Sequence, residues 1–177
     1  MVMGAASTQA RERRREGRRC VMSLVTMYLR DRHVSFEVLP HRRAVSCHQE
    51  AQVLGVDAET VVKTVVLATA DDYWLAVVPA SCRVDLGLVR NALNDAGARL
   101  ASEGELLVAF PRYELGALPP LGRLLGVPMV MDPRVLAQGT AIFAGGTETE
   151  SVMVRTTELF DGEPKLVAPI AYEPARD

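Results

Sequence analysis

The stretch "TVVKTVVLATADDYWLAVVPA", residues 60–80, decides the fold. Its first ten residues are rich in β-branched side chains, which are enriched in strands. The "ADD" at 70–72 then supplies a turn before a second apolar run, "YWLAVVPA". The stretch therefore predicts an antiparallel β-hairpin whose second strand is buried.

The segments on either side of this hairpin mix helices and strands without a regular alternation. Helical spacing and capping signals predict helices at 24–32, 46–54 and 85–94, and another that starts at 102. Apolar runs predict strands at 34–38, 126–132, 140–146 and 151–156, followed by a Pro-rich tail. Without a βαβ repeat, the order favours an α+β fold: a mixed, curled β-sheet or partly open barrel, flanked by short helices.

The composition is that of a single soluble domain, with 177 residues of which 49% are hydrophobic and 24% charged. No apolar run reaches the roughly 18 residues of a membrane span, so no membrane partner is expected. The three cysteines, Cys20, Cys47 and Cys82, have no CxxC spacing, which favours a reduced, cytoplasmic protein. No His, Cys and acidic residues have metal-ligand spacing, so we expect no metal and no other cofactor.

Charge divides the chain at about residue 22. The segment 11–20 holds six arginines and two glutamates, and since the whole chain carries −2, the remainder carries about −6. We expect residues 1–22 to be a disordered basic extension, and 23–177 to be one domain with a loose Pro-rich tail. A nucleic-acid-binding arm and a start site at Met22 or Met27 are alternative interpretations of the basic segment.

Lys63 is unusual because it stands in the middle of the first hairpin strand. Period-two alternation places it on the same face as Val61 and Val65. Lysine is almost never fully buried without a partner. The ammonium group therefore either meets an anionic partner inside the protein or lies on a hydrated face, and the pattern does not decide between the two.

The segment "GALPPLG", residues 116–122, is also unusual, because it is a stiff loop between two apolar regions. Gly116 lets another backbone or a ligand approach closely and can adopt positive φ. Pro119 and Pro120 fix their own φ angles and restrict the residue before each of them. Such a loop is either the wall of a binding site, which loses little entropy on binding, or a rigid connector.

Several segments together resemble the YbaK/prolyl-tRNA synthetase editing-domain family, from about Leu24 to Phe160. They are "VLPHRRAVSCHQEA", "VVKTVVL", "YWLAVVPA", "GALPPLG", "VPMVMD" and "IFAGGTETES". The resemblance implies an aminoacyl-tRNA deacylase that hydrolyses mischarged tRNA in trans, without a metal. The implied partners are the acceptor end of tRNA and, in addition, an aminoacyl-tRNA synthetase.

The resemblance also implies roles for the two unusual features. Lys63 matches the family lysine, which engages the terminal phosphate or substrate oxygens. Gly116 and Pro120 are the first and last residues of the family's GxxxP motif, whose loop positions the aminoacyl ester. Water would attack with help from the ribose 2′-hydroxyl, so that catalysis rests on placement and electrostatics. In that case Lys63 and Gly116 face each other across one cleft.

Four further residues follow at 145–148. Gly145 and Gly146 would allow close approach of the substrate, and Thr147 offers a hydroxyl. Glu148 stands where many relatives carry histidine, so its carboxylate either reaches the substrate α-ammonium or faces solvent. The amino acid that is removed therefore stays open.

Asp132 and His41 complete the expected substrate-binding residues. Asp132 matches a family aspartate, although a strand-ending turn or a cap explains it equally well, and His41 matches a family histidine that a structural role explains as well. Two other functions stay open. One is a non-catalytic adaptor of the same fold that binds aminoacyl-tRNA or a synthetase. The other is a hydrolase of small aminoacyl esters, which the acidic body favours.

Overall fold

The hairpin predicted at the centre of the chain is present in the computed structural model, which describes residues 23–175. The basic segment at 1–22 therefore lies outside the described residues. Strand β2 (Val62–Ala68) pairs antiparallel with β3 (Tyr73–Pro79), from Val62 opposite Pro79 to Ala68 opposite Tyr73.

The hairpin forms the centre of a mixed five-stranded sheet of order β5-β2-β3-β6-β9. The short strand β5 (Arg99–Leu100) pairs antiparallel with β2, whereas β6 (Met129–Met131) runs parallel to β3 and β9 (Leu166–Val167) parallel to β6. Alternate hairpin residues enter two cores. Val66 and Val77 join the main core, and Leu67 and Val78 join a second core. Burial on both faces explains why these strands are apolar apart from Lys63 and Thr64.

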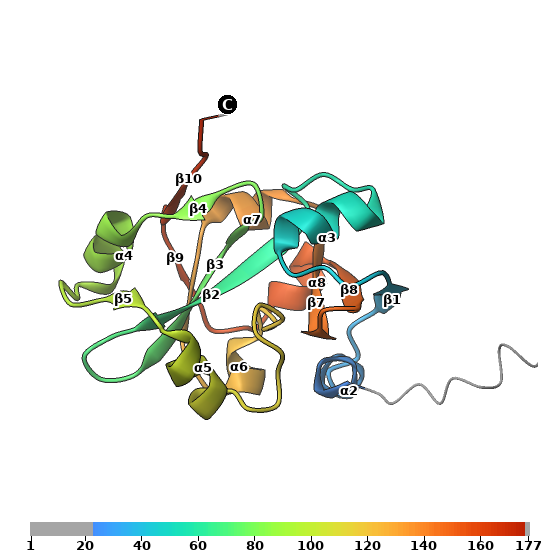
Figure 1. The fold of residues 1–177 in the computed structure, drawn as a ribbon, viewed down its shortest axis with the longest axis horizontal. Helices are drawn as coiled ribbons and strands as arrows, with labels where there is room; N and C mark the ends of the chain where they lie inside the picture. The colour runs from blue at the N-terminus through green and yellow to red at the C-terminus, as the bar shows by residue number, and fades with distance from the viewer. Residues whose placement is uncertain (1–22, 176–177) are drawn as a thin grey trace, which may run out of the picture.

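A second, antiparallel sheet has the order β1-β8-β7. Its strands are β1 (Phe36–Pro40), β7 (Thr140–Thr147) and β8 (Glu150–Arg155). A parallel bridge between Val61 and Ile142 joins the two sheets, and the Ile142 N–H donates to the Thr60 carbonyl at 3.0 Å. Figure 1 shows the sheets as two halves of the molecule. The α+β class with mixed, open sheets is thus confirmed, although the strands form separate sheets rather than a single curled one.

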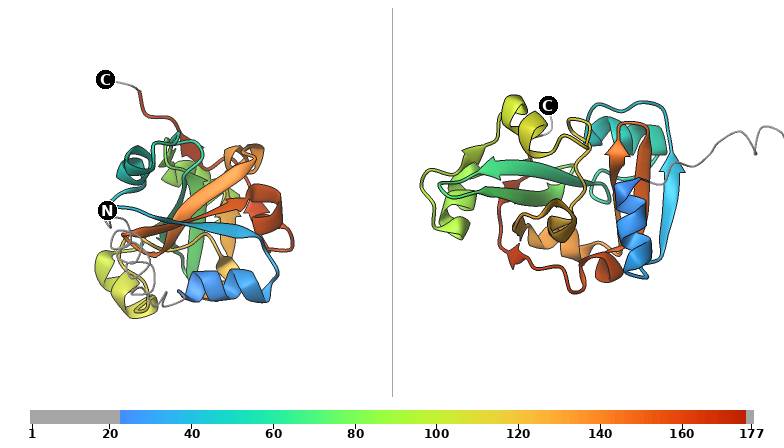
Figure 2. Two further views of the ribbon diagram at one scale, coloured as in Figure 1. Left: turned by 90° about the vertical axis from the view of Figure 1, so that its right-hand side faces the viewer. Right: turned by 90° about the horizontal axis from the view of Figure 1, so that it is seen from below.

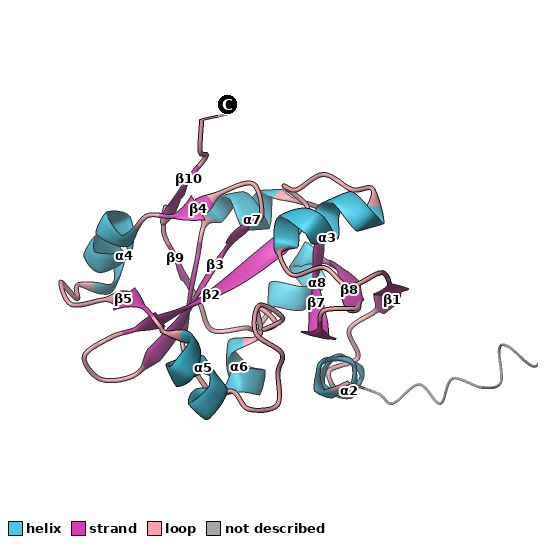
Figure 3. Ribbon diagram, in the orientation of Figure 1, coloured by secondary structure: helices cyan, strands magenta, loops and turns pink. Residues whose placement is uncertain are grey.

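Short helices surround the sheets (Figure 3). Their bounds are α2 (Leu24–Asp31), α3 (Cys47–Leu54), α4 (Leu86–Leu93), α5 (Glu103–Ala109), α6 (Gly122–Leu125), α7 (Pro133–Ala137) and α8 (Thr156–Phe160). The capping residues identified in the sequence act as expected. Ser46 accepts from the Gln49 N–H at 3.2 Å, Asp85 caps α4, and Ser102 with Glu105 forms a capping box. Helix α2 lies along the three-stranded sheet (Figure 2).

The C-terminal tail is more ordered than the sequence predicts. Besides β9, it contributes β10 (Ala171–Tyr172), which pairs with β4 (Arg83–Val84). The Ile170 N–H donates to Oδ2 of Asp132 at 3.1 Å. The tail was expected to be loose because it is Pro-rich, but backbone pairing and this buried carboxylate anchor it. Within residues 23–175, no helix is both long and apolar enough to cross a membrane.

Candidate functional site

The Gly/Pro loop enters the core at one end and reaches the surface at the other. Residues 117–122 are all buried, and Leu118 and Leu121 belong to the main core. Gly116 is exposed and has φ +82°, a conformation that L side chains rarely adopt. The buried end therefore holds an exposed glycine backbone in a fixed position.

Gly116 lies at the edge of a small hollow, which we call the Gly116 hollow. Its lining comes from the loop after β1, the start of α3, the Gly/Pro loop and the β7–β8 hairpin. The lining residues are His41, Ala44, Ser46, Glu50, Gly116, Ala117, Ala144, Thr147, Glu148 and Ser151. Four of the predicted site residues thus come together: His41, Gly116, Thr147 and Glu148.

Three side chains of this hollow form a hydrogen-bonded chain. Nε2 of His41 lies 2.7 Å from Oγ of Ser151, and the Ser151 hydroxyl donates to Oε1 of Glu50. Nδ1 of His41 lies 2.7 Å from the Arg42 carbonyl oxygen. Burial raises the pKa of Glu50, whereas the Ser151 hydroxyl and the charge of His41 act in the opposite direction.

Glu148 is held at the rim of the hollow. Its carboxylate pairs with the guanidinium of Arg43, and its N–H donates to Oε2 of Glu114 at 2.6 Å. The Arg43 side chain is 72% exposed, so water screens this pair and the guanidinium can exchange with another cation.

Lys63 does not line the Gly116 hollow. Its Nζ donates to the Cys82 carbonyl at 2.7 Å, and burial lowers the pKa of its ammonium group. The next residue in β2, Val62, packs in the same core as Leu118 of the Gly/Pro loop, so Lys63 leaves the opposite face of the strand. The expectation of one cleft shared by Lys63 and Gly116 is therefore corrected.

Lys63 instead lines a second, larger hollow of about 580 Å³, which we call the Lys63 hollow. Its walls come from α3, the segment before β2, β2 itself, the turn between β3 and β4, and the C-terminal tail. The lining residues are His48, Ala58, Glu59, Lys63, Ala80, Ser81, Cys82, Arg83, Glu173, Pro174 and Ala175.

The first turn of α3 lies between the two hollows. Ser46 lines the Gly116 hollow, and His48 lines the Lys63 hollow. Burial raises the pKa of the intervening Cys47 thiol to about 12; the charge of Glu50 adds to this rise and that of Lys63 opposes it. Because Ser46 and His48 are two positions apart at the start of α3, the two hollows are neighbours across one turn of helix.

The remaining predicted site residues line neither hollow. Asp132 is 1% exposed, caps α7 through the Arg134 N–H at 3.1 Å, and holds Ile170 as described above. Pro120 is buried in the loop. The structure thus gives Asp132 the capping role that the sequence left open.

Gly145 and Gly146 stand at a break in the β7–β8 register, between Ala144 and Thr147. A Cβ on Gly145 would lie 3.1 Å from Oε1 of Glu150, and Gly146 has φ +106°. Such bulges re-aim the residues that follow them. The two glycines therefore shape the hairpin that brings Thr147 to the hollow.

Glu50 and Ser151 line the Gly116 hollow but were not among the residues predicted from the sequence. A signal for Glu50 was present: Cys47, Glu50, Ala51 and Leu54 follow the i, i+3, i+4, i+7 spacing of a buried helix face. A carboxylate on such a face requires a partner. Ser151 had no comparable signal, because its contact with Glu50 joins residues 101 positions apart.

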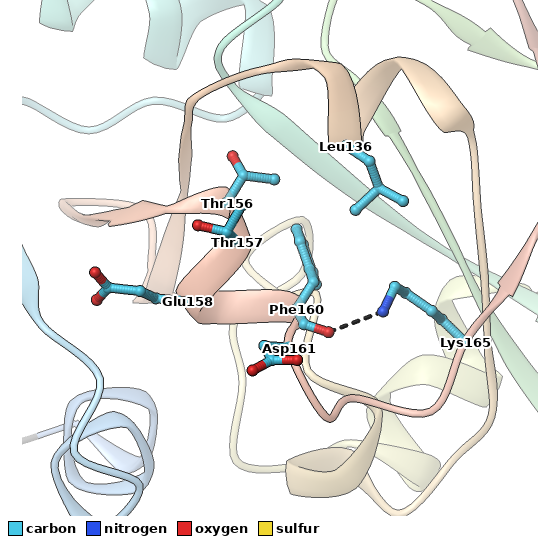
Figure 4. Close-up of a pocket in the computed structure, with 7 residues that line it drawn as sticks. All are labelled: Leu136, Thr156, Thr157, Glu158, Phe160, Asp161 and Lys165. Atoms are coloured by element: carbon cyan, nitrogen blue, oxygen red, sulfur yellow. Dashed lines mark hydrogen bonds between the residues drawn. The ribbon is translucent and has the colours of Figure 1, made fainter.

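Two further features lie outside the Gly116 hollow. A third hollow of about 490 Å³ lies between α7 and α8, where Lys165 donates to the Phe160 carbonyl at 2.8 Å (Figure 4). It contains none of the predicted site residues. In the Lys63 hollow, ligand atoms of Glu59, Cys82 and Glu173 lie within 4.8 Å of one another. The Arg134 guanidinium already lies 2.9 Å from Sγ of Cys82, so a metal cation there would be repelled.

Residues 41–161 match the family model of the aminoacyl-tRNA editing domain. Since this match covers more than half of the chain, the protein belongs to that family, and the resemblance seen in the sequence is confirmed. The proline–tRNA ligase of Aromatoleum aromaticum is 35% identical over 147 residues, which cover 76% of this chain and 25% of the ligase. The chain thus spans about a quarter of the length of this curated relative.

Solved structures share the fold. A hypothetical protein superposes with a TM-score of 0.76 at 21% identity, covering 84% of this chain and 99% of that one. A candidate trans-editing enzyme for prolyl-tRNA synthetase gives a TM-score of 0.73 at 23% identity, with 84% and 95% covered. The architecture is therefore that of the editing-domain family.

Proposed function

We propose that the protein is an aminoacyl-tRNA deacylase that hydrolyses mischarged tRNA in trans. The family match over residues 41–161 carries this proposal, because that range contains every residue that lines the Gly116 hollow. The ligase relative and the trans-editing neighbour point to prolyl-tRNA synthetase as the system whose errors are corrected. We place the reaction in the cytoplasm, with the tRNA acceptor end as partner.

In this proposal the two hollows have different roles: one binds the terminal nucleotide and the other lies beside the ester. The Lys63 hollow has the volume of a typical ligand site, about 300–1,000 Å³, and receives the terminal nucleotide of the tRNA. Lys63 then exchanges its bond to the Cys82 carbonyl for a charge-assisted bond to a phosphate oxygen. The ester lies at the mouth of the Gly116 hollow, where the exposed glycine backbone allows close approach.

The Gly116 hollow is too small to hold an amino-acid side chain. Space for the centre of a water molecule amounts to about 10 Å³ there, which is room for about one water. The amino-acid side chain must therefore stay at the rim, beside the Arg43–Glu148 pair. Water attacks the ester with help from the ribose 2′-hydroxyl, and placement supplies much of the rate.

The test is deacylation of a panel of mischarged tRNAs by the purified protein. We expect turnover with one or a few small amino acids, and a loss in Lys63→Ala. Lys165→Ala is the matched control, because that lysine also donates to a backbone carbonyl but lies in the third hollow. Background rates for every tRNA would overturn the proposal.

The separation of Lys63 from Gly116 favours a second candidate, an adaptor that binds aminoacyl-tRNA or a synthetase without turnover. It predicts tight tRNA binding with no deacylation. The net charge of about −6 outside the basic segment favours a hydrolase of small aminoacyl esters. That candidate predicts turnover that salt does not weaken, whereas tRNA binding weakens as salt rises.

A further inference from the structure

The chain formed by His41, Ser151 and Glu50 has no role in the proposal above, although all three residues line the Gly116 hollow. Glu50 is 5% exposed and Ser151 is 0% exposed. A buried carboxylate is costly unless its environment favours the charge or it binds a proton. The hydrogen-bonded chain of His41, Ser151 and Glu50 therefore requires an explanation beyond packing.

Hydrogen-bond accounting shows that the chain holds one extra proton. The Arg42 carbonyl only accepts, so Nδ1 of His41 must donate to it. Ser151 makes two hydrogen bonds, one with Nε2 of His41 and one with Oε1 of Glu50, and each needs its own proton. If His41 were neutral and Glu50 ionised, both Nε2 and Oε1 could only accept, and the Ser151 hydroxyl has a single proton to donate. Two placements satisfy every contact: an imidazolium with an ionised Glu50, or a neutral imidazole with a protonated Glu50.

One oxygen of the chain is available to a substrate. Ser151 binds Oε1 of Glu50, whereas the described part of the structure gives Oε2 no hydrogen-bond partner. The hollow beside it has room for about one water. Oε2 can therefore meet a single water molecule next to the loop of Gly116.

We propose that Glu50 is the general base of the ester hydrolysis and that His41, acting through Ser151, keeps its carboxylate ionised. This inference rests on the proposed function. Oε2 takes a proton from the water, whose oxygen forms a bond to the ester carbonyl carbon. The bond from that carbon to the ribose oxygen breaks, and the ribose oxygen leaves with the electron pair and takes the proton from Glu50. Water is the only co-reactant, and the products are the free amino acid and tRNA.

Other ionisable groups also lie near Glu50. Cys47 precedes it on α3, and Glu148, which is paired with Arg43, lines the same hollow from the β7–β8 hairpin next to Glu114. Burial raises the pKa of Glu50 and the Ser151–His41 pair lowers it. Removing the Ser151 hydroxyl therefore raises this pKa further, and the acid limb of the pH–rate profile moves to higher pH.

The first experiment measures single-turnover deacylation of the best tRNA substrate against pH. Glu50→Gln should lower the rate about 10²- to 10⁴-fold, the usual contribution of a general base. Ser151→Ala should lose activity at acidic pH and recover as the pH rises. Glu105→Gln is the matched control, because Glu105 also accepts from a serine hydroxyl, at 2.9 Å, but lies outside both hollows. An unchanged rate in Glu50→Gln, or an unmoved acid limb in Ser151→Ala, overturns the proposal.

The second experiment separates a base from an anchor for the substrate α-ammonium. The same tRNA is charged with lactate, in which a hydroxyl replaces the α-ammonium of alanine. A base is needed for both esters, so Glu50→Gln should be slow on both. A loss confined to the alanyl ester, or a wild type that leaves the lactyl ester intact, assigns Glu50 to the ammonium and overturns the proposal.

The third experiment needs no activity, so it distinguishes failure of this inference from failure of the proposed function. The ring ¹⁵N shifts of His41 should be those of an imidazolium in the wild type at neutral pH. They should become those of a neutral ring in Glu50→Gln, which lacks the counter-charge. A neutral ring in the wild type contradicts the charge arrangement, whereas an imidazolium in a protein without deacylase activity contradicts the proposed function alone.

Discussion

The Gly116 hollow and the Lys63 hollow differ in size and in how their polar groups are held. The first has room for about one water, and its chain of His41, Ser151 and Glu50 is fixed by side-chain hydrogen bonds. The second measures about 580 Å³, and its lysine is tied only to one backbone carbonyl. Fixed groups suit a reacting centre, and an open hollow with a flexible cation suits a charged ligand. We therefore expect changes in the first hollow to alter kcat and changes in the second to alter KM.

In the Lys63 hollow, the largest effect is expected from Lys63→Ala. A bond to a charged group contributes about 1.5–3 kcal/mol, so kcat/KM for tRNA should fall about 10- to 100-fold, mainly through KM. Steady-state kinetics at two salt concentrations provide the measurement, with Lys165→Ala beside it. A loss confined to kcat would show that Lys63 acts in the chemical step, and would contradict the assignment of kcat effects to the first hollow and KM effects to the second.

Asp132→Ala tests whether the tail is a genuine wall of the Lys63 hollow. The change removes the cap of α7 and the acceptor of the buried Ile170 N–H, so we expect the free energy of unfolding to fall by about 2–3 kcal/mol. Urea unfolding measures this loss. KM should rise more than kcat falls, because Glu173 and its neighbours line only the larger hollow.

Gly116→Ala should have a smaller effect on stability, about 1–2 kcal/mol, because φ is +82°. The nearest atom that its Cβ would meet is 3.9 Å away, so strain and not a clash causes the loss. The loop should shift and lower kcat. Thermal unfolding combined with single-turnover rates tests this, and a variant with an altered KM but a normal kcat would contradict it.

The smallest effect is a difference in pH dependence between two glutamates that both bind a serine. Burial raises the pKa of Glu50, so its ionisation costs stability as the pH rises above its ordinary value of 4.5. Glu50→Gln should therefore be more stable than the wild type at neutral pH, and this difference should shrink below pH 4.5.

Glu105 should show the opposite sign. Its hydrogen bond to Arg99, together with Ser102, lowers its pKa to about 2. Its stabilisation is complete above 4.5 and is lost as the pH falls towards 2. Glu105→Gln should therefore be less stable at neutral pH and equal to the wild type in strong acid. Thermal unfolding across pH measures both curves, and curves of the same sign would show that burial does not control Glu50.

Local signals predicted much of the fold. The β-branched run and the "ADD" turn located the hairpin, and Ser46, Asp85 and Ser102 located helix starts, because caps and turns depend on neighbouring residues. The division of the strands between the three-stranded and the five-stranded sheet could not be predicted. It depends on the pairing of β1 with β8, which brings together residues more than 100 positions apart.

The candidate site was predicted only in part, again because local signals do not show which distant residues come together. Alternation along β2 showed which residues share a face with Lys63, but it does not say which face of the sheet meets the Gly/Pro loop. His41 was identified by resemblance alone, without its partners. Glu50 was detectable in principle as a carboxylate on an apolar helix face, whereas Ser151 acquires its meaning only from the folded β8.

The pairing of β10 with β4 has a practical consequence. It places the last described residues, 173–175, at the Lys63 hollow, so this part of the wall follows the last buried, strand-paired segment of the tail. A carboxypeptidase that removes only the residues after Tyr172 should strip the wall away while leaving the buried Ile170 and the smaller hollow untouched. Controlled trimming of the native protein could thus separate capture of the nucleotide from cleavage of the ester without any mutation.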